Sequence, residues 1–323
     1  MLRLPDRRSP FLLVALFLGA LAMGYGLRQV STAIPDGLIL AAPLGLGWIA
    51  PLLWGRRAIV PFLLGSILAA ALVSGPPELV LAAVVLSSVE VGLGYWYSRY
   101  RAFPDGLNRF CDLRAFALAG AGAAAIRAAL VVAFGMVLGI ETPWLYGFAA
   151  LGLTWFSNLV FAAVLLVPTG RWRIIWSVPR ALELAVNLLL LTALLQYLFE
   201  TAGPKGINYT FAIAVGLIVV ETWLALRFHI RGVGLHRTIW LLLCLLYIVR
   251  HGGVDELMPL FRDPIYCGQF MLVLGVLLFI EMTVAAIASE RTFEVGANAE
   301  LAAELTAHDA VLWHTNNCVF PID

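Results

Sequence analysis

Charged residues are scarce in this chain: they make up 13% of its 323 residues, whereas hydrophobic residues make up 62%. Soluble domains carry about a quarter charged residues. The composition therefore excludes an ordinary soluble domain and predicts an integral membrane protein whose surroundings are the lipid bilayer. Cysteine is also scarce, with four residues. Only Cys267 is expected on the outer side of the membrane, so no intrachain disulfide is predicted.

The chain also lacks the common motifs of catalytic and metal sites. It has no Walker loop, no Gly-x-Ser-x-Gly elbow and no zinc-protease helix. His229, His236 and His251 have no Cys, His or Asp neighbours at metal-ligand spacing. We therefore expect no enzymatic activity, no metal and no cofactor, and no nucleic-acid partner.

Long apolar runs dominate the sequence, and about ten of them reach or approach the length needed to cross a bilayer. They lie near residues 11–27, 38–54, 59–74, 79–97, 115–140, 144–168, 181–199, 209–226, 236–249 and 265–289. We predict an all-α fold, a polytopic integral membrane helix bundle of about ten transmembrane helices. Residues 1–290 would form the membrane-embedded domain. Residues 291–323 would form a cytoplasmic helical tail without an output domain, the last span continuing as a helix through Glu294–Trp313.

The distribution of positive charge tests this topology independently. With the N-terminus in the cytoplasm, sixteen of the 21 lysines and arginines, Arg237 among them, fall in cytoplasmic segments. Arg127 falls inside a span, and the four on the outer side are Arg28, Lys205, Arg250 and Arg262. Removing one span would invert every later loop and destroy this positive-inside bias. Both termini are therefore predicted to be cytoplasmic.

One stretch, residues 42–65, is apolar but repeatedly interrupted by proline and glycine, with Arg56 and Arg57 at its centre. Because an interior proline removes a helical hydrogen bond, the stretch predicts two short spans joined by a charged turn. The charge distribution places that turn at the cytoplasmic face. The breaks then lie toward the outer half of the membrane. This makes the hairpin a candidate sensing element, with Pro43, Gly45 and Trp48 as candidate ligand contacts.

Several ionisable and polar side chains lie at membrane depth, where they are costly and tend to face the bundle interior or a cavity. Candidates for a polar pocket or an ion path are Glu90, Arg127, Trp155, Asn158, Glu221 and Glu281. The alternative is structural: Glu90 and Arg127 form one ion pair, and Asn158 and Asn187 hydrogen-bond between helices. The sequence leaves both interpretations open because it does not show which helices are neighbours.

Five short motifs occur in a fixed order along the membrane portion. They are Pro43-Leu-Gly45, Leu52-Leu-Trp-Gly-Arg-Arg57 with Pro61 and Leu64-Gly65, Glu90 with Gly92 and Gly94, Trp155 to Pro168, and Ala225-Leu-Arg-Phe228 with Arg231-Gly232. In these motifs residues 11–290 resemble the first family of membrane-associated sensor (MASE) domains, the polytopic input modules of bacterial histidine kinases and diguanylate cyclases. The chain has Ser157-Asn158 and Ser87-Ser88 where that family typically shows Gly-Asp and Gly-Asn.

The resemblance implies a sensory input module in the bacterial cytoplasmic (inner) membrane, acting in two-component or cyclic di-GMP signalling. It would detect a signal or small ligand in or at the membrane and transmit it through its last helix to a cytoplasmic output, as a homodimer or with a signalling partner. A transporter or channel for ions or small molecules is the second possibility, with the intramembrane charges lining a path. An integral membrane enzyme is the third, but the sequence supplies no catalytic cluster for it.

Overall fold

The computed structural model describes residues 14–22, 45–72, 77–100, 107, 109–166, 178–205, 220, 222–228, 233–234, 236–237 and 264–317. Almost all of these residues are helical, and none of them lies in a β-strand. The all-α prediction is therefore confirmed for the part of the chain that the structure describes.

Five apolar helical stretches are long enough to cross a membrane, judged by length and composition. They are Leu46–Leu72, Val80–Tyr100, Phe110–Val137, Pro143–Phe161 and Cys267–Thr292. Helix α7 (Val178–Lys205) adds a shorter apolar stretch, Ala181–Leu190. Most of the predicted span near 209–226, and nearly all of the one near 236–249, lies outside the described residues. The five stretches are compatible with a multi-pass membrane protein.

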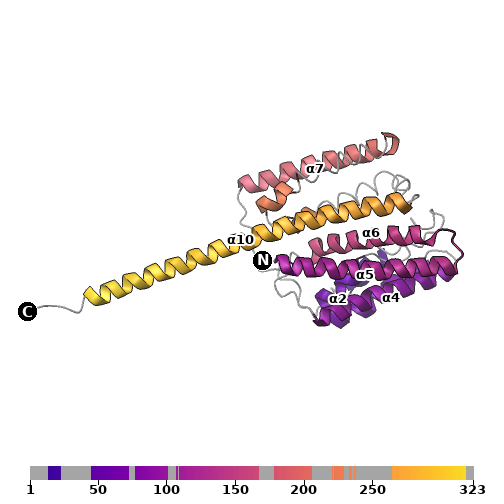
Figure 1. The fold of residues 1–323 in the computed structure, drawn as a ribbon, viewed down its shortest axis with the longest axis horizontal. Helices are drawn as coiled ribbons and strands as arrows, with labels where there is room; N and C mark the ends of the chain where they lie inside the picture. Colours follow the sequence, from indigo (N-terminus) through magenta and orange to yellow (C-terminus); the bar gives the residue numbers. More distant parts are fainter. Residues whose placement is uncertain are drawn as a thin grey trace, which may run out of the picture.

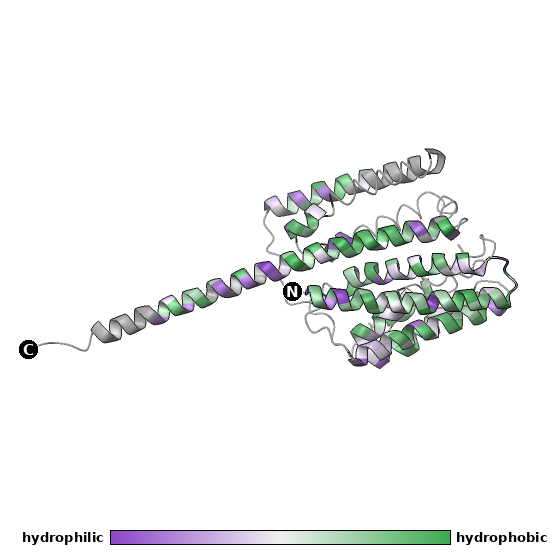
Figure 2. Ribbon diagram, viewed as in Figure 1, coloured by the Kyte–Doolittle hydropathy of each residue, from purple (hydrophilic) through white to green (hydrophobic). Residues whose placement is uncertain are grey.

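The distribution of apolar side chains fits the same conclusion. Large hydrophobic side chains point away from the bundle, such as Val60, 62% exposed, Leu118, 68% exposed, and Leu189, 70% exposed. Charged groups such as Glu90 and Arg127 are instead buried. In a soluble monomer, extended apolar surface of this kind is rare, whereas lipid is a good solvent for it. Green, hydrophobic ribbon covers most of the bundle in Figure 2.

The main helices lie side by side along one direction (Figure 1). Helix α10 (Pro264–Asn317) packs on α6 (Pro143–Phe161), α6 packs on α5 (Phe110–Val137), and α4 (Pro77–Tyr100) receives α2 (Leu46–Trp54) and α3 (Ile59–Leu72). The C-terminal half of α10 projects beyond the bundle. Its ribbon there mixes hydrophilic and hydrophobic residues, in contrast to the apolar half inside the bundle (Figure 2).

The interrupted stretch folds as two short helices that turn back on each other at a charged turn. That each of them crosses the membrane separately stays a prediction, because Leu46–Leu72 has the length of a span only as a whole. Helices α2 and α3 are joined by a 3₁₀ turn, η2 (Gly55–Ala58), which carries Arg56 and Arg57. A Cβ on Gly47 would lie 2.7 Å from the Phe62 ring. Fifteen residues of straight helix would separate these positions by about 22 Å, so the chain must fold back between them. The break lies at Gly55, which has a positive φ of 62°, while α2 continues through Pro51.

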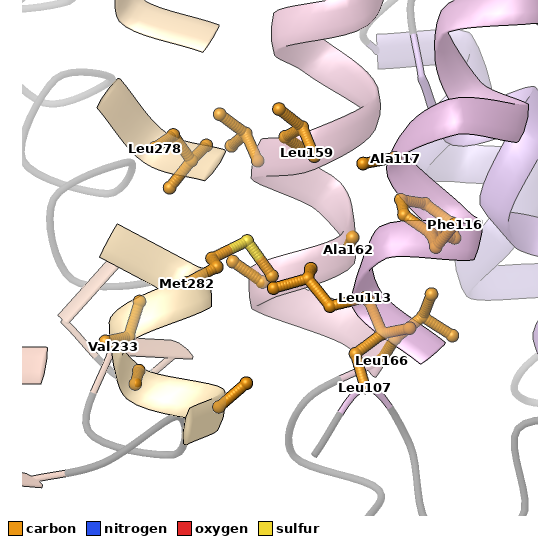
Figure 3. Packing of buried hydrophobic residues seen from close by; sticks show 14 of the residues in the cluster. Leu107, Leu113, Phe116, Ala117, Leu159, Ala162, Leu166, Val233, Leu278 and Met282 are labelled. Atoms are coloured by element: carbon orange, nitrogen blue, oxygen red, sulfur yellow. The ribbon is translucent and has the colours of Figure 1, made fainter. Parts of the chain in front are cut away.

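The largest buried cluster lies where α5, α6 and α10 meet. Figure 3 shows Leu113 and Phe116 of α5 beside Leu159 of α6 and Met282 of α10. At this level α6 passes into a π-helical turn, η3 (Ala162–Leu166). Such turns widen a helix locally and are frequent at functional sites. The cluster therefore packs three helices together, and its members Leu159 and Val160 follow Asn158 directly on α6.

Candidate functional site

The polar centre of the bundle is an ion pair between α4 and α5. Arg127 Nη1 donates to Glu90 Oε2 at 2.8 Å, and both side chains are buried, 3% and 4% exposed. The predicted Glu90–Arg127 pair is therefore confirmed. The other carboxylate oxygen, Oε1, accepts the backbone N–H of Gly45 at 2.7 Å. Glu90 thus holds the start of α2 with one oxygen and α5 with the other.

Gly45 occupies a position that only glycine fits easily. Its φ of 75° lies in the left-handed region, and a Cβ there would lie 2.8 Å from the backbone carbonyl of Ser157 on α6. Any other residue would be strained by its conformation and would collide with α6. The hairpin therefore begins in direct contact with the helix that carries Trp155 and Asn158.

Trp48 is one turn further along α2 and is 3% exposed. Its indole stacks on Tyr97 of α4, with ring centroids 5.3 Å apart, and lies against Phe116 of α5, with centroids 6.3 Å apart. Aromatic pairs at these separations add to the stabilisation from burial. The indole Nε1–H is buried and has no hydrogen-bond partner among the described residues.

Asn158 and Trp155 tie α6 to the backbone of α5. Asn158 Nδ2 donates to Gly120 O, and Trp155 Nε1 donates to Ala117 O, both at 3.3 Å. The interhelical hydrogen bond predicted for Asn158 is confirmed. Among the described residues Asn187 shows no such bond: its Nδ2 donates to Glu183 O, four residues earlier in its own helix α7. Asparagine side chains often bond to a backbone carbonyl of the preceding helical turn.

The contact between α6 and α10 is made close by glycines. A Cβ on Gly152 of α6 would lie 2.6 Å from Gly268 O of α10, and a Cβ on Gly275 of α10 would lie 2.9 Å from the Trp155 ring. Small residues of this kind let membrane helices approach within backbone distance. Trp155 therefore contacts α10 with its ring and α5 with its N–H.

A second buried ion pair joins α10 to residue 237. Arg237 Nη2 donates to Glu281 Oε2, and both side chains are buried. The sequence did not predict this pair. A buried carboxylate such as that of Glu281, 2% exposed, needs a cationic partner inside the bundle, and the cytoplasmic location of residue 237 stays a prediction. Neighbouring His236 is also fully buried.

The candidate residues divide into two groups. Gly45, Trp48, Glu90, Arg127, Trp155 and Asn158 lie around the α2–α4–α5–α6 junction, and together with Gly120 we call them the interior site. Glu281 belongs to the separate pair on α10. Pro43 and Glu221 lie outside the described residues. The sequence did not single out Tyr97, Gly120 and Arg237, which contact Trp48, Asn158 and Glu281. A tyrosine at the membrane interface, a glycine in a small-residue run and an arginine near the end of a span are all common in membrane helices, so none of them stands out.

No group of three or more potential metal ligands occurs among the described residues. Comparisons with protein-family models, curated proteins and solved structures give no match for this chain. The interpretation of the site therefore depends on its geometry.

Proposed function

We propose that this chain is the sensory input module of a signalling system in the bacterial cytoplasmic membrane. In this proposal the bundle detects a signal in or at the membrane, and α10 transmits it to a cytoplasmic output carried by a partner or a second copy. The observation that carries the proposal is the continuity of α10. This helix runs without a break from Pro264 to Asn317, beginning inside the bundle and ending well beyond it.

An uninterrupted helix is suited to this task because rotation or translation at one end reaches the other end. Its apolar part, Cys267–Thr292, packs on α6. Beyond it, every side chain from 301 to 308 is exposed, including Leu301 and Leu305. These leucines lie four residues apart and so share one face of the helix. They offer a surface for a helical partner or a second copy.

A chain of direct contacts supports coupling between the hairpin and α10. Gly45 meets Ser157 of α6, and Trp48 meets Phe116 of α5. Trp155, two residues before Ser157, packs on Gly275 of α10. A ligand that moved α2 would therefore displace α6 at its contact with α10. Contiguity permits such coupling but does not measure it, so the test must record a response.

The pairing of intramembrane charges favours a sensor over a transporter or channel. Two acidic and two basic groups are buried near the described helices α4, α5 and α10, and they form the pairs Glu90–Arg127 and Glu281–Arg237. A buried charge that is paired is bound to its partner rather than presented to a passing ion. The sequence motifs shared with MASE domains and the predicted ten-span topology with cytoplasmic termini point in the same direction.

The test is a fusion of residues 1–317 to a cyclase or kinase catalytic domain, with one to seven alanines inserted after Ala302. If α10 transmits a rotation, output should oscillate with the length of the insertion. Activity should return near insertions of four and seven residues, because the helix repeats every 3.6 residues. Insertions of the same lengths made of glycine and serine, which form a flexible linker rather than continue the helix, serve as the control and should lower output without oscillation.

Output that falls smoothly with insertion length, or is unaffected, would contradict transmission through α10. The transporter alternative predicts a different result. It requires substrate flux in proteoliposomes that is lost in Glu90→Gln while the fusion shows no periodicity.

A further inference from the structure

We propose that the turn η2, between α2 and α3, binds the headgroup phosphate of an anionic phospholipid through Arg56 and Arg57, with the acyl chains lying along α3. This inference does not depend on the proposed signalling function. It starts from the charge of the turn. Both arginines are exposed, and neither forms an ion pair with another described residue.

The neighbouring segments offer this charge no acidic partner among the described residues. The sequence has no aspartate or glutamate between Asp36 and Glu78. Helix α4, on which η2 packs, carries two carboxylates. One is Glu78 in its first turn, and the other is Glu90, which is buried against Arg127. The turn therefore presents two adjacent positive charges whose counter-charge lies outside the described part of the chain.

The contacts of α2 place this turn at one membrane surface. Gly45 meets Glu90 of α4. One turn later Trp48 meets Gly94 and stacks on Tyr97, so α2 runs in the same direction as α4 toward the C-terminal end of that helix. Helix α4 has 24 residues and rises about 36 Å, enough to cross a hydrocarbon core of about 30 Å. Its end, and the turn beside it, therefore lie at the level of the lipid headgroups.

Exposed aromatic rings near the end of α4 mark the same level. Trp96 and Tyr100 are 59% and 73% exposed, with ring centroids 4.8 Å apart. Between them in sequence, exposed Arg99 donates from Nη1 to Tyr95 Oη at 3.4 Å. Tryptophan, tyrosine and arginine gather at membrane–water interfaces in this way.

Helix α3 supplies an apolar face that leads from the arginines toward the membrane interior. Val60, Leu64 and Leu68 are 62%, 55% and 41% exposed, and their four-residue spacing puts them on one face of the helix. Val60 follows Arg57 by about one turn. From Val60 to Leu68 the helix rises about 12 Å, close to the depth of one leaflet, about 15 Å. An acyl chain along this face leaves its headgroup at the turn.

The chemistry of the turn selects an anionic phospholipid. Guanidinium groups bind phosphate oxygens through paired N–H···O bonds. A zwitterionic lipid also has a phosphate, but its own cationic group leaves the charge of the turn unbalanced. A free anion balances the charge but has no chains to cover the apolar face of α3. An anionic phospholipid meets both requirements, and basic clusters at the cytoplasmic surface of membrane proteins attract such headgroups.

The first experiment is native mass spectrometry of the full chain, released from nanodiscs that hold equal amounts of phosphatidylglycerol and phosphatidylcholine with the same acyl chains. Each arginine near the surface favours an anionic lipid about fivefold, and the two together about 30-fold. We therefore expect phosphatidylglycerol to be retained about 30 times more often. Arg56→Gln and Arg57→Gln should each lower the preference about fivefold, and the double variant should remove it.

The matched control is Arg227→Gln. It removes the same single charge from an exposed arginine, but Arg227 is already paired with Glu183 at 3.2 Å, so the lipid preference should not change. All these side chains are exposed, and the variants should melt at the wild-type temperature in phosphatidylcholine alone. Equal retention of the two lipids by the wild-type chain would overturn the proposal. An undiminished preference in the double variant would overturn it as well.

A second measurement locates the lipid on the turn. Val60→Cys, in a background without other cysteines, carries a bimane label in vesicles that contain brominated lipid. Brominated phosphatidylglycerol should quench the label more strongly than brominated phosphatidylcholine at the same mole fraction, and Arg56→Gln/Arg57→Gln should abolish the difference. The same label at Leu72→Cys, exposed at the other end of α3, should not distinguish the two lipids. Equal quenching at residue 60 by both lipids in the chain with its arginines would exclude the site.

Inorganic phosphate separates a lipid from a free anion. In tenfold molar excess over the lipid, phosphate should leave the retained phosphatidylglycerol in place, because it cannot cover the apolar face of α3. Displacement of the lipid by phosphate would show that the turn binds a free anion and would overturn the assignment to a phospholipid.

Discussion

Glu90 joins three elements through one carboxylate, which receives the Gly45 N–H at the start of α2 and the guanidinium of Arg127 on α5 while its own backbone belongs to α4. Burying two charges costs several kcal/mol per ion, and the attraction between them compensates only when both partners are present. The pair therefore contributes little net stability, but it fixes how α2, α4 and α5 are positioned relative to one another.

The first prediction concerns this pair. Glu90→Gln keeps an oxygen for Gly45 but removes the carboxylate charge that Arg127 faces at 2.8 Å, and should lower the free energy of unfolding by about 3–5 kcal/mol. The double variant Glu90→Gln/Arg127→Met removes the arginine charge as well and should recover most of the loss. Denaturant unfolding in detergent, followed by tryptophan fluorescence, measures both. A double variant no more stable than Glu90→Gln would show that the loss has another origin.

The second prediction concerns two glycines of α4. A Cβ on Gly94 would collide with the backbone carbonyl of Trp48, whereas a Cβ on Gly92 would meet nothing within 4 Å. Gly94→Ala should push α2 away from α4 and lower the melting temperature. Gly92→Ala, the matched control, should be neutral or gain up to about 1 kcal/mol from helix propensity. Equal melting temperatures for the two variants would mean that α2 and α4 are not in backbone contact.

At the scale of elements, α10 contributes more than packing. Glu290 Oε1 accepts the backbone N–H of Phe110 at 3.0 Å, across 180 residues of sequence. Phe110 is the first residue of α5, whose N-cap residue Arg109 supplies no side-chain cap. A helix start has free N–H groups that require acceptors, so Glu290 caps α5 from the point where the apolar part of α10 ends. Movement of α10 and fraying of α5 are thereby linked.

The third prediction follows from this cap. Glu290→Ala should destabilise the first turn of α5 by about 1 kcal/mol, the usual cost of losing a cap. Hydrogen exchange of the amides at Phe110–Leu113 should rise about fivefold. In Glu290→Gln, which retains a hydrogen-bond acceptor, hydrogen exchange of the same amides should rise less than in Glu290→Ala.

The control for the cap is Glu294→Ala, one turn further along α10 at an exposed position. It should leave exchange at the start of α5 unchanged. If it accelerates exchange as much as Glu290→Ala does, the effect comes from α10 as a whole rather than from the cap.

At the scale of the whole molecule, the described helices bury their paired charges among apolar side chains and carry large hydrophobic side chains on the outside. This arrangement suits a lipid environment. Helix α5 has the length to connect the two membrane surfaces, since its 28 residues rise about 42 Å. Cys111 is exposed and lies near the N-terminal end of α5. Glu141 is also exposed and lies in the turn that follows the C-terminal end of α5. These two positions therefore test whether α5 crosses the membrane and in which direction.

The fourth prediction uses labelling with a membrane-impermeant maleimide. A variant that keeps Cys111 as its single cysteine should react only in inverted vesicles, in keeping with a cytoplasmic start of α5. Glu141→Cys in a background without other cysteines should react only from the outside. Reaction of both positions from one side would mean that α5 does not span. Reaction with reversed sidedness would overturn the predicted cytoplasmic termini.

The sequence by itself determined the class of the fold and the kind of residue at its centre. Low charge and long apolar runs predict membrane helices because a bilayer leaves few other ways to satisfy the backbone. The interrupted run at 42–65 predicts two short helical segments joined by a charged turn. An ion pair between Glu90 and Arg127 was one of two interpretations that the sequence left open, favoured because an unpaired charge at that depth is costly. Each of these inferences needs only the type of residue at a position and the fact that lipid surrounds it. Both can be read from the sequence without knowing which helices are neighbours.

Tertiary structure decided which of these groups meet. Gly45 of the α2 start meets Glu90 of α4 and Ser157 of α6, and the Trp48 indole comes close to Gly120 of α5. Arg237 finds Glu281, and Glu290 finds the start of α5, across 44 and 180 residues. Hydrophobic periodicity cannot encode these contacts, because a lipid-exposed face and a packed face are equally apolar in a membrane helix. Only the packing of small residues against neighbouring helices distinguishes them.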